Sequence, residues 1–276
     1  MDVEVHNMQE IESLNQRGGR TLSIVDLVLD GTITAEMAAL CWMMLDGGSG
    51  LLTGAVPGGA GKTTLMASLL AFLPPGEPIV SVSDPSVIRQ AVDGGPRPLT
   101  LMAHEIGSGF YYGYVWGRDA AAFFSAAAHG VRCATCIHAD TAEQSRQKLL
   151  SLGTDPADFA RIGLQLYMHV GRRAGRIARR VSRLYCAADG AHRTVYEWDP
   201  DSDVFARSLE PDAVLRLVGS AVQSDPAAAE ESWLGRRRFL EGLADDGVRR
   251  FEEVRSAVLD FYHGSVRGAA GAWERD

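Results

Sequence analysis

One glycine-rich turn, placed between an apolar run and a helical segment, constrains this chain more than any other feature. The apolar run covers residues 51–53, the turn 54–61, and the helical pattern 62–70. This order of strand, loop and helix is the context that a phosphate-binding loop, or P-loop, requires. Glycines without a Cβ let backbone N–H groups turn toward a phosphate, and the turn supplies Gly58, Gly59 and Gly61.

The residues that follow the turn carry the chemistry of nucleotide binding. Lys62 is predicted to reach the β- and γ-phosphates of ATP, and the hydroxyl of Thr63 to hold Mg²⁺. The N-terminus of the helix adds unpaired N–H groups and its positive dipole end. We therefore predict ATP and Mg²⁺ as ligands, bound by Pro57, Gly58, Gly59, Ala60, Gly61, Lys62, Thr63 and Thr64.

The loop departs from the GxxxxGK[ST] motif at one position. Val56 stands where the motif has its first glycine, and Gly54 comes two residues earlier. We interpret the loop as slightly lengthened. The alternative is a glycine-rich turn that merely precedes an ordinary helix.

Composition limits the class of protein. The 276 residues are 46% hydrophobic and 22% charged, enough for an ordinary core in one large α/β domain or one domain with an appendage. A net charge of −8 argues against a whole-surface nucleic-acid binder, and we expect no nucleic acid as partner. The chain shows no apolar run of about 18 residues and no signal-peptide pattern at its start. These features predict a cytoplasmic protein.

Strand-like and helical segments alternate through the first two thirds of the chain, which predicts a mostly parallel sheet flanked by helices. Strands are expected at 78–85, 99–105, 110–116 and 131–138, and Thr34, Asp155 and Asp225 are expected to begin helices. We divide the chain into a polar, loosely attached arm (1–22), a nucleotide-binding core (23–168), and a region of basic strands, a β-hairpin and C-terminal helices (169–276).

Three candidate catalytic residues fall at predicted strand ends, where ligands bind in such sheets. They are Asp84, Glu105 and His138. The sequence leaves open whether all three share one edge with the loop. Cys133, Cys136 and His138 resemble a metal fragment, but residues 133 and 136 of a strand point to opposite faces. Buried structural thiols are the favoured interpretation, and a metal site is the alternative.

With these pieces the chain resembles the type II/type IV secretion, pilus and archaellum motor ATPase family, and its archaeal branch most of all. The resemblance runs from about Ser23 to Tyr262. Val82–Pro85 matches the Asp box, Gly113–Ala120 the Walker B segment, Thr135–Asp140 the His box, and 196–200 with the closing helices the archaeal extension. The resemblance implies a RecA-like P-loop ATPase that assembles with copies of itself or with a related ATPase, and works on a membrane-embedded platform protein.

The family pattern is broken at two carboxylates. Ser83 stands at the Asp-box glutamate and Tyr114 at the Walker B glutamate, the groups that orient water and Mg²⁺ in the family. Asp84, as a metal ligand through water, or Glu105, on the γ-phosphate side, could restore hydrolysis; otherwise each is an ordinary strand-end carboxylate. His138 matches the family's γ-phosphate-sensing histidine, against the alternative of a structural histidine.

Members of the family carry an N-terminal domain before the motor domain. The twenty or so polar residues at the start of this sequence are not expected to form one. Six arginines lie where the family has basic residues near a subunit interface, and we expect a solvated or partner-facing ribbon rather than a trans contact to phosphate: Arg172, Arg173, Arg176, Arg179, Arg180 and Arg183. The runs 236–238 and 249–250 are expected to be solvated helix faces.

Three functions remain open at this level. The favoured one is an ATP·Mg-binding subunit of a secretion- or pilus-type machine with weak or altered hydrolysis, cytoplasmic or peripheral at the inner face of the membrane. The alternatives are an active motor ATPase that uses Glu105 or Asp84, and a non-binding scaffold. A different P-loop enzyme, such as a small-molecule kinase, is the least favoured, because no segment resembles an acceptor-binding lid.

Overall fold

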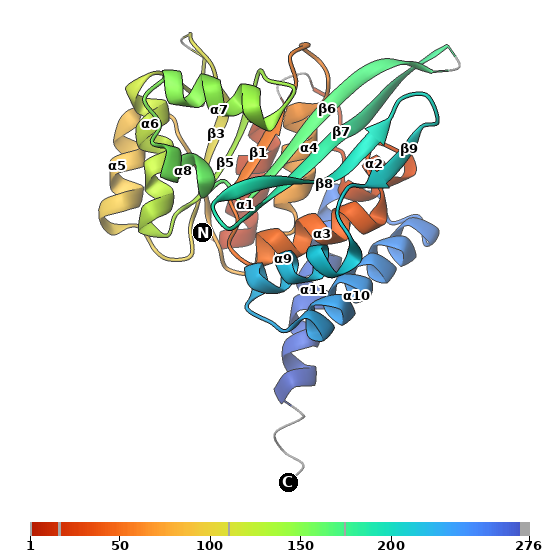
Figure 1. The fold of residues 1–276 in the computed structure, drawn as a ribbon. Coiled ribbons are helices and arrows are strands. Elements are labelled where there is room, and N and C mark those ends of the chain that lie inside the picture. The colour runs from red at the N-terminus through yellow and green to blue at the C-terminus, as the bar shows by residue number, and fades with distance from the viewer. Residues whose placement is uncertain (1, 16–17, 110, 174, 271–276) are drawn as a thin grey trace.

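The computed structural model describes residues 2–15, 18–109, 111–173 and 175–270. Its described strands form one sheet in the order β2-β3-β5-β1-β6-β7-β8-β9, with β4 paired to β3 (Figure 1). The strands are β1 Leu51–Gly54, β2 Ile79–Ser81, β3 Thr100–Ile106, β4 Tyr114–Val115, β5 Arg132–Ile137, β6 Leu164–Arg173, β7 Arg176–Ala188, β8 Ala191–Asp199 and β9 Val204–Arg207.

The sheet has a parallel half and an antiparallel half. The pairs β2–β3, β3–β4, β3–β5, β5–β1 and β1–β6 are parallel. From β6 onward the pairs β6–β7, β7–β8 and β8–β9 are antiparallel, as expected for consecutive hairpins. The predicted α/β class with a mostly parallel sheet and a later β-hairpin is confirmed. The basic strands and hairpin extend this same sheet rather than forming a separate one.

Helices cover both faces of the sheet, and each face has its own hydrophobic core. Figure 1 shows α5 to α8 gathered on one side, with α3, α9 and α10 on the other. The helices are α1 Val3–Ser13, α2 Ile24–Leu29, α3 Ala35–Asp46, α4 Lys62–Leu70, α5 Pro85–Gly94, α6 Arg118–Ser125, the 3-10 turn η1 Ala126–His129, α7 Ala142–Ser151, α8 Pro156–Ala160, α9 Pro211–Val222, α10 Pro226–Asp245 and α11 Phe251–Ala270.

The two cysteines of β5 lie in opposite cores, as the alternation of a strand predicts. Cys136 packs in the core under α3 and α4, and Cys133 in the core under α5 and α6. Both thiols are fully buried, and burial raises the pKa of the Cys136 thiol to about 11. Within the described residues, no group of three metal-ligating side chains forms a metal site.

Side-chain caps fix where most helices begin. Thr34 accepts a hydrogen bond from the N–H of Met37, Asp155 from that of Ala157, and Asp225 from those of Ala227 and Ala228. These three predicted caps are confirmed, because each supplies an acceptor to an otherwise unpaired N–H. Of the helices in the described ranges, none combines the length and apolar character needed to cross a bilayer.

The N-terminal residues form a packed helix, which corrects the expectation of a loosely attached arm. Ile11 of α1 is 2% exposed. Asn7 donates to the carbonyl of Glu77 and accepts from the N–H of Ile79, so α1 covers the open edge of β2. An uncovered strand edge offers unpaired backbone groups to other chains, and the Asn7 amide satisfies two of them. The division at residue 22 stays a prediction.

Two further expectations about local structure change. The strand expected at 110–116 shrinks to β4, Tyr114–Val115, and Phe110 lies outside the described residues. The run 236–238 is not simply a solvated face. Arg236 is buried, pairs with Asp46, and lies 5.2 Å from the ring centroid of Trp42. A guanidinium can be buried in this way because a carboxylate and an aromatic face both receive it.

Candidate functional site

The glycine-rich loop connects β1 to α4 and turns through two left-handed glycines. Gly59 has a φ of +79° and Gly61 a φ of +102°, a region that disfavours residues with a Cβ. A Cβ at Gly61 would also lie 3.2 Å from Cδ of Arg179. The backbone at Gly61 therefore requires glycine for both its conformation and its space.

Helix α4 differs from most other helices at its N-terminus. Side chains cap α1, α2, α3, α5, α7, α8 and α10, but Gly61 precedes α4 and no side-chain hydrogen bond caps it. The first N–H groups of α4 are thus left for a ligand, and the helix dipole favours an anion at this end. Lys62 and Thr63 are the first two residues of α4.

A cleft of about 920 Å³ opens over this loop. Of the eight predicted nucleotide-binding residues, seven line the cleft, and Pro57 does not. Glu105 and His138 line it too. The sheet order explains this, because β1, β5 and β3 are neighbours and all run parallel, so their carboxyl ends meet at one edge. The structure thereby brings together the loop, Glu105 and His138.

Glu105 is held between two partners at the carboxyl end of β3. Its Oε1 lies 2.7 Å from Nε2 of His138, and its Oε2 accepts a hydrogen bond of 3.1 Å from the hydroxyl of Tyr114. The pairing of β3 with β5 shifts register between Ala103 and Ile106. Such irregularities re-aim side chains next to functional sites, and here Glu105 faces the cleft although the residue is only 8% exposed.

His138 connects this carboxylate to the loop. Its Nδ1 lies 3.0 Å from the carbonyl oxygen of Val56 and 3.5 Å from Nζ of Lys62. Lys62 is only 7% exposed, although it lines the cleft. The four side chains Lys62, His138, Glu105 and Tyr114 therefore form one contiguous polar chain across the cleft.

Tyr114 acts as a hydrogen-bond donor in this chain. Burial, together with the nearby charge of Glu105, raises the pKa of the Tyr114 hydroxyl to about 12. The hydroxyl therefore keeps its proton at neutral pH and donates it to the carboxylate. The sequence singled out Tyr114 only as the residue in place of a glutamate, and nothing in the pattern indicated this bond.

The structure does not bring Asp84 into the cleft. Its carboxylate is the N-cap of α5, accepts a hydrogen bond of 2.8 Å from the N–H of Ser86, and is absent from the residues that line the cleft. Hydrogen bonding by Ser86 lowers the pKa of Asp84. Of the two predicted metal ligands, only Thr63 lines the cleft. A metal role for Asp84 stays a prediction.

Of the six arginines of β6 and β7, three form ion pairs with carboxylates and Arg179 contacts the glycine-rich loop. Asp203 receives Arg180 at 2.9 Å and Arg173 at 3.2 Å, and Glu197 receives Arg183 at 2.8 Å. Arg179 instead lies over the loop, where its Nε donates to the carbonyl oxygen of Gly59 at 3.3 Å. The sequence identified these arginines as a cluster, but only the strand alternation and the hairpin register separate Arg179 from its neighbours.

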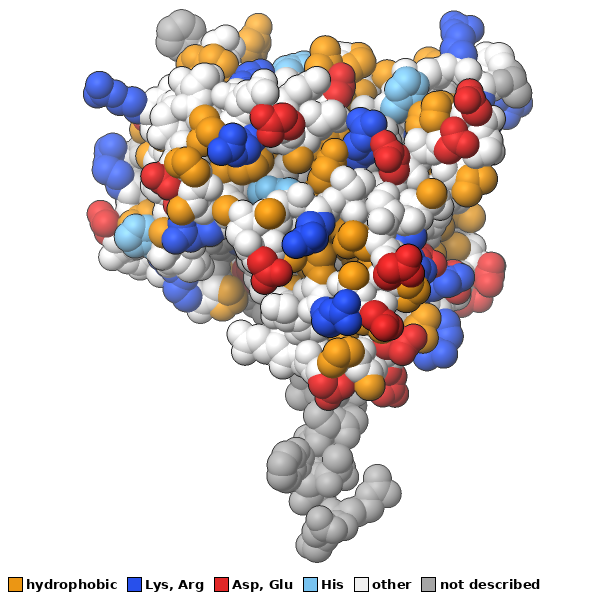
Figure 2. All heavy atoms as spheres, in the orientation of Figure 1, with side chains coloured by type: hydrophobic (Ala, Val, Ile, Leu, Met, Phe, Trp, Pro, Cys, Tyr) orange, Lys and Arg blue, Asp and Glu red, His pale blue; other side chains and the backbone are white. Residues whose placement is uncertain are grey.

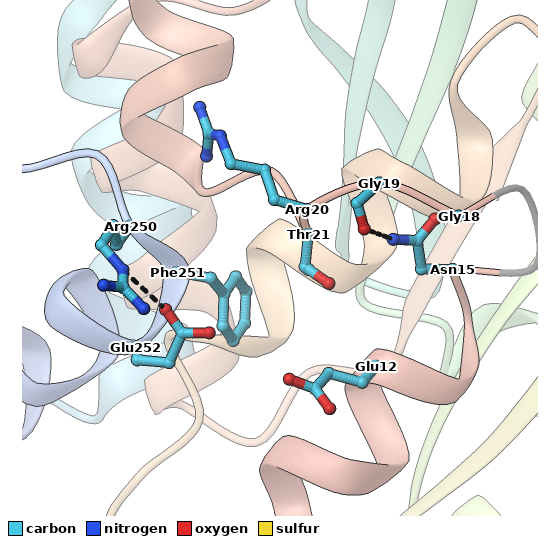
Figure 3. A pocket seen from close by; sticks show the side chains of 9 residues that line it. All are labelled: Glu12, Asn15, Gly18, Gly19, Arg20, Thr21, Arg250, Phe251 and Glu252. Atoms are coloured by element: carbon cyan, nitrogen blue, oxygen red, sulfur yellow. Dashed lines mark hydrogen bonds and ion pairs between the residues drawn. The ribbon is translucent and has the colours of Figure 1, made fainter.

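A second hollow, of about 390 Å³, shares a wall with the cleft. Figure 3 shows its side chains coming from the end of α1, from the segment that follows it and from the start of α11, with Arg250 paired to Glu252 and Asn15 bonded to Gly19. Asn15, Gly18, Arg20 and Thr21 line both spaces. The N-terminal segment thus forms one wall of the cleft mouth.

Basic residues outnumber acidic ones in the lining of the cleft, with Arg20, Lys62, Arg173, Arg176, Arg179 and Arg180 against Asp30 and Glu105. On the face shown in Figure 2, basic and acidic side chains lie interspersed rather than in one continuous field. A continuous basic field is the usual electrostatic footprint of a nucleic-acid-binding surface. The expectation that nucleic acid is not a partner stays a prediction from the net charge of −8.

Comparisons with known proteins give relatives at low identity, and no protein-family model matches the chain. The chain is similar to the uncharacterized protein MJ0900 of Methanocaldococcus jannaschii, with 23% identity over 279 residues, 90% of this chain and 50% of that protein. It is also similar to the uncharacterized protein MJ1287 of the same organism, with 24% identity over 271 residues, 86% of this chain and 98% of that protein. The chain thus spans half the length of one relative and nearly all of the other.

Two solved structures are similar to part of the chain. The Legionella pneumophila ATPase DotB matches with 13% identity and a TM-score of 0.38, over 69% of this chain and 52% of that one. The VirB11 ATPase of the Brucella suis type IV secretion system, solved with sulphate, matches with 18% identity and a TM-score of 0.38, over 65% and 55%. The chain covers little more than half of each of these structures.

Proposed function

We propose that this chain is a P-loop ATPase that binds ATP and Mg²⁺ at the loop before Lys62 and hydrolyses ATP with Glu105. The observation that carries the proposal is one cleft containing the uncapped N-terminus of α4, Lys62, Thr63, Glu105 and His138. An anion site and an acid–base group within one cleft are the two parts that phosphoryl transfer to water requires.

The loop and α4 supply the phosphate site of the proposal. The left-handed Gly59 and Gly61 let the backbone approach a phosphate closely, and the free N–H groups of α4 point to the same place. Lys62 provides the single ammonium charge at the base of the cleft. The Thr63 hydroxyl fits the position of a Mg²⁺ ligand, and bound Mg²⁺ would neutralise charge on the phosphates.

The position of Glu105 favours active hydrolysis over the weak or altered hydrolysis that the sequence suggested. That interpretation assigned the Walker B segment to Gly113–Ala120, with Tyr114 in place of its glutamate. In the structure Glu105 is the next-to-last residue of the buried strand β3, which lies two positions from β1 in the sheet, and β4 pairs with β3. We infer that 100–105 is the Walker B strand of this chain and that Glu105 supplies its carboxylate.

Within this proposal Glu105 accepts a hydrogen bond from the attacking water and later its proton. Tyr114 orients the carboxylate from one side, and His138 from the other. His138 also contacts the loop at Val56, so the position of this histidine depends on the loop conformation. This contact gives His138 a way to respond to a γ-phosphate, which is the role that the resemblance implies.

The proposal extends to the assembly in which the ATPase works. The ordered motifs resemble motor ATPases of secretion and pilus machines, so we propose a homo-oligomer, or a hetero-oligomer with a related ATPase, on a membrane-embedded platform protein at the cytosolic side. Light scattering with and without ATP·Mg tests the oligomer. A monomer under both conditions would contradict the oligomeric part and leave the ATPase assignment to the test that follows.

Lys62→Ala provides the test of ATP binding. Wild type is expected to gain thermal stability with ATP·Mg and to release phosphate, because a ligand that binds only the folded state stabilises it. Lys62→Ala is expected to lose both effects. If both proteins bind ATP alike, the P-loop assignment is wrong. If neither is stabilised by ATP, the third interpretation, a scaffold without nucleotide binding, is favoured.

A further inference from the structure

Arg179 is the arginine of the antiparallel half that lies over the nucleotide loop of its own chain. It comes from β7, which follows the loop by more than a hundred residues in sequence and lies two positions from β1 in the sheet. Its Nε donates to the Gly59 carbonyl oxygen at 3.3 Å, and its Cδ would lie 3.2 Å from a Cβ at Gly61. The aliphatic part of the side chain thus rests on the loop that precedes Lys62.

Among the described residues, Arg179 forms no ion pair with a carboxylate. Within the described residues, Arg173, Arg180 and Arg183 each form an ion pair, whereas no carboxylate lies within 4.0 Å of the Arg179 guanidinium. The one hydrogen bond described for its guanidinium goes to a neutral carbonyl, and the residue is exposed. The Nη1 and Nη2 groups are therefore available as donors at the mouth of the cleft.

These donors lie in the same cleft as Lys62, because Arg179 and Lys62 both line it. A planar guanidinium donates two parallel hydrogen bonds to phosphate oxygens, which an ammonium cannot do. Lys62 comes from the start of α4 and Arg179 from β7, so a triphosphate held by the loop would meet cations from two separate elements. Exchanging the bond to a neutral carbonyl for bonds to phosphate oxygens is favourable because charge-assisted bonds are stronger.

We propose that Arg179 binds the terminal phosphate of ATP in the cleft of its own subunit, and so distinguishes ATP from ADP. The inference rests on the proposed nucleotide binding at the loop. It differs from the sequence-based expectation, in which the arginine cluster faced solvent or a partner and contacted phosphate, if at all, in a neighbouring subunit. It also gives the antiparallel half of the sheet a direct role in the site.

The test measures ATP and ADP affinity, each with Mg²⁺, for wild type, Arg179→Ala, Arg179→Gln and Arg179→Lys. The matched control is Arg172→Ala, because Arg172 is an exposed arginine of the same hairpin that does not line the cleft. For Arg179→Ala and Arg179→Gln we expect ATP affinity to fall about 10-fold or more and ADP affinity to change little. Arg179→Lys is expected to keep part of the preference for ATP over ADP, since it keeps the positive charge but cannot donate two parallel hydrogen bonds as a guanidinium does.

The alternative role for Arg179 is to support the loop through Gly59 alone. In that case Arg179→Ala lowers ATP and ADP affinity equally, and Arg179→Gln, which still carries an N–H donor for the carbonyl, restores both. Either of these results overturns the proposal. So does recovery of phosphate release on mixing Arg179→Ala with Lys62→Ala, because recovery would show that the arginine acts on a neighbouring subunit.

Failure of this inference is distinguishable from failure of the proposed function. If Lys62→Ala loses ATP binding while Arg179→Ala behaves like Arg172→Ala, the loop binds ATP and only the inference is wrong. If Lys62→Ala binds ATP like wild type, the proposed function itself is wrong. Circular dichroism of each variant verifies that the fold is retained.

Discussion

The two halves of the sheet use charged residues in different ways. In the parallel half the strands are buried, and charges occur at the strand ends: Glu77 and Arg132 at the amino ends, Glu105 and His138 at the carboxyl ends. In the antiparallel half the arginines lie along exposed strand faces. Three of them, Arg173, Arg180 and Arg183, pair with carboxylates of neighbouring strands and turns.

This difference shows what decides the role of a charged residue in each half. In the parallel half the role of a charged residue depends on which end of its strand it occupies. Charges at the amino ends form a buried ion pair, whereas charges at the carboxyl ends line the cleft. In the antiparallel half the nearest partner decides the role. Arg179 contacts the glycine-rich loop and its neighbour Arg180 contacts Asp203, although both belong to β7.

The largest effect on stability is expected from the buried ion pair of the parallel half. Arg132 and Glu77 have side chains that are 5% and 1% exposed and lie 2.7 Å apart. Arg132→Met would leave Glu77 buried without its charge partner, and should lower the free energy of unfolding by about 3–5 kcal/mol. Urea denaturation measures this change.

The control for Arg132→Met comes from the other half. Arg183 and Glu197 have side chains that are 38% and 48% exposed, so Arg183→Met should cost under about 1 kcal/mol. Equal losses in the two variants would contradict the contrast between the halves. The double variant Glu77→Leu/Arg132→Met should recover much of the loss, because it removes both buried charges.

A smaller effect, on turnover, is expected for Tyr114→Phe. This variant removes the hydroxyl that donates to Glu105 and keeps the ring, so the carboxylate loses one of its two orienting contacts. Turnover of ATP should fall about 3- to 10-fold with ATP affinity unchanged, the size expected for one hydrogen bond. Tyr111→Phe is the control, because Tyr111 is 69% exposed and contacts Tyr114 through its ring. A loss of ATP affinity in Tyr114→Phe would instead indicate a role in binding.

The smallest effect is expected on the pH dependence of stability, through Asp203 in the antiparallel half. Arg180, through its hydrogen bonds, lowers the pKa of Asp203 to about 2 from an ordinary 3.8. The carboxylate therefore stabilises the fold above pH 4, and this contribution is lost as pH falls from about 4 to 2. Asp203→Asn should flatten that part of the stability profile, with a loss at neutral pH of at most about 1 kcal/mol. Thermal unfolding between pH 2 and 5 measures it, and an unchanged slope would show that Asp203 does not contribute.

Much of the parallel half could be predicted from the sequence. The apolar runs, the loop glycines and the helix caps Thr34, Asp155 and Asp225 are local signals, and local signals act over a few residues. They placed the loop, Glu105 and His138 at strand ends. That these ends share one edge depends on the strand order, which local signals do not determine.

The remaining features depend on contacts between distant residues. Helix α1 looks polar in sequence, yet Asn7 satisfies the edge of β2 some seventy residues away. Arg236 looks like part of a solvated run until Asp46 and Trp42 are placed around it. The segment 113–120 resembles a Walker B motif in its spacing, but it follows the buried strand that carries Glu105. Spacing alone does not show which strand is buried beside β5.

The measurement that tests the central claim most directly is phosphate release from ATP·Mg by Glu105→Gln, with ATP affinity measured on the same protein. Glutamine keeps the shape of the side chain and one acceptor oxygen but cannot accept a proton. The account predicts that turnover falls about 100-fold or more while ATP binds as tightly as to wild type. Wild-type turnover in Glu105→Gln would contradict it.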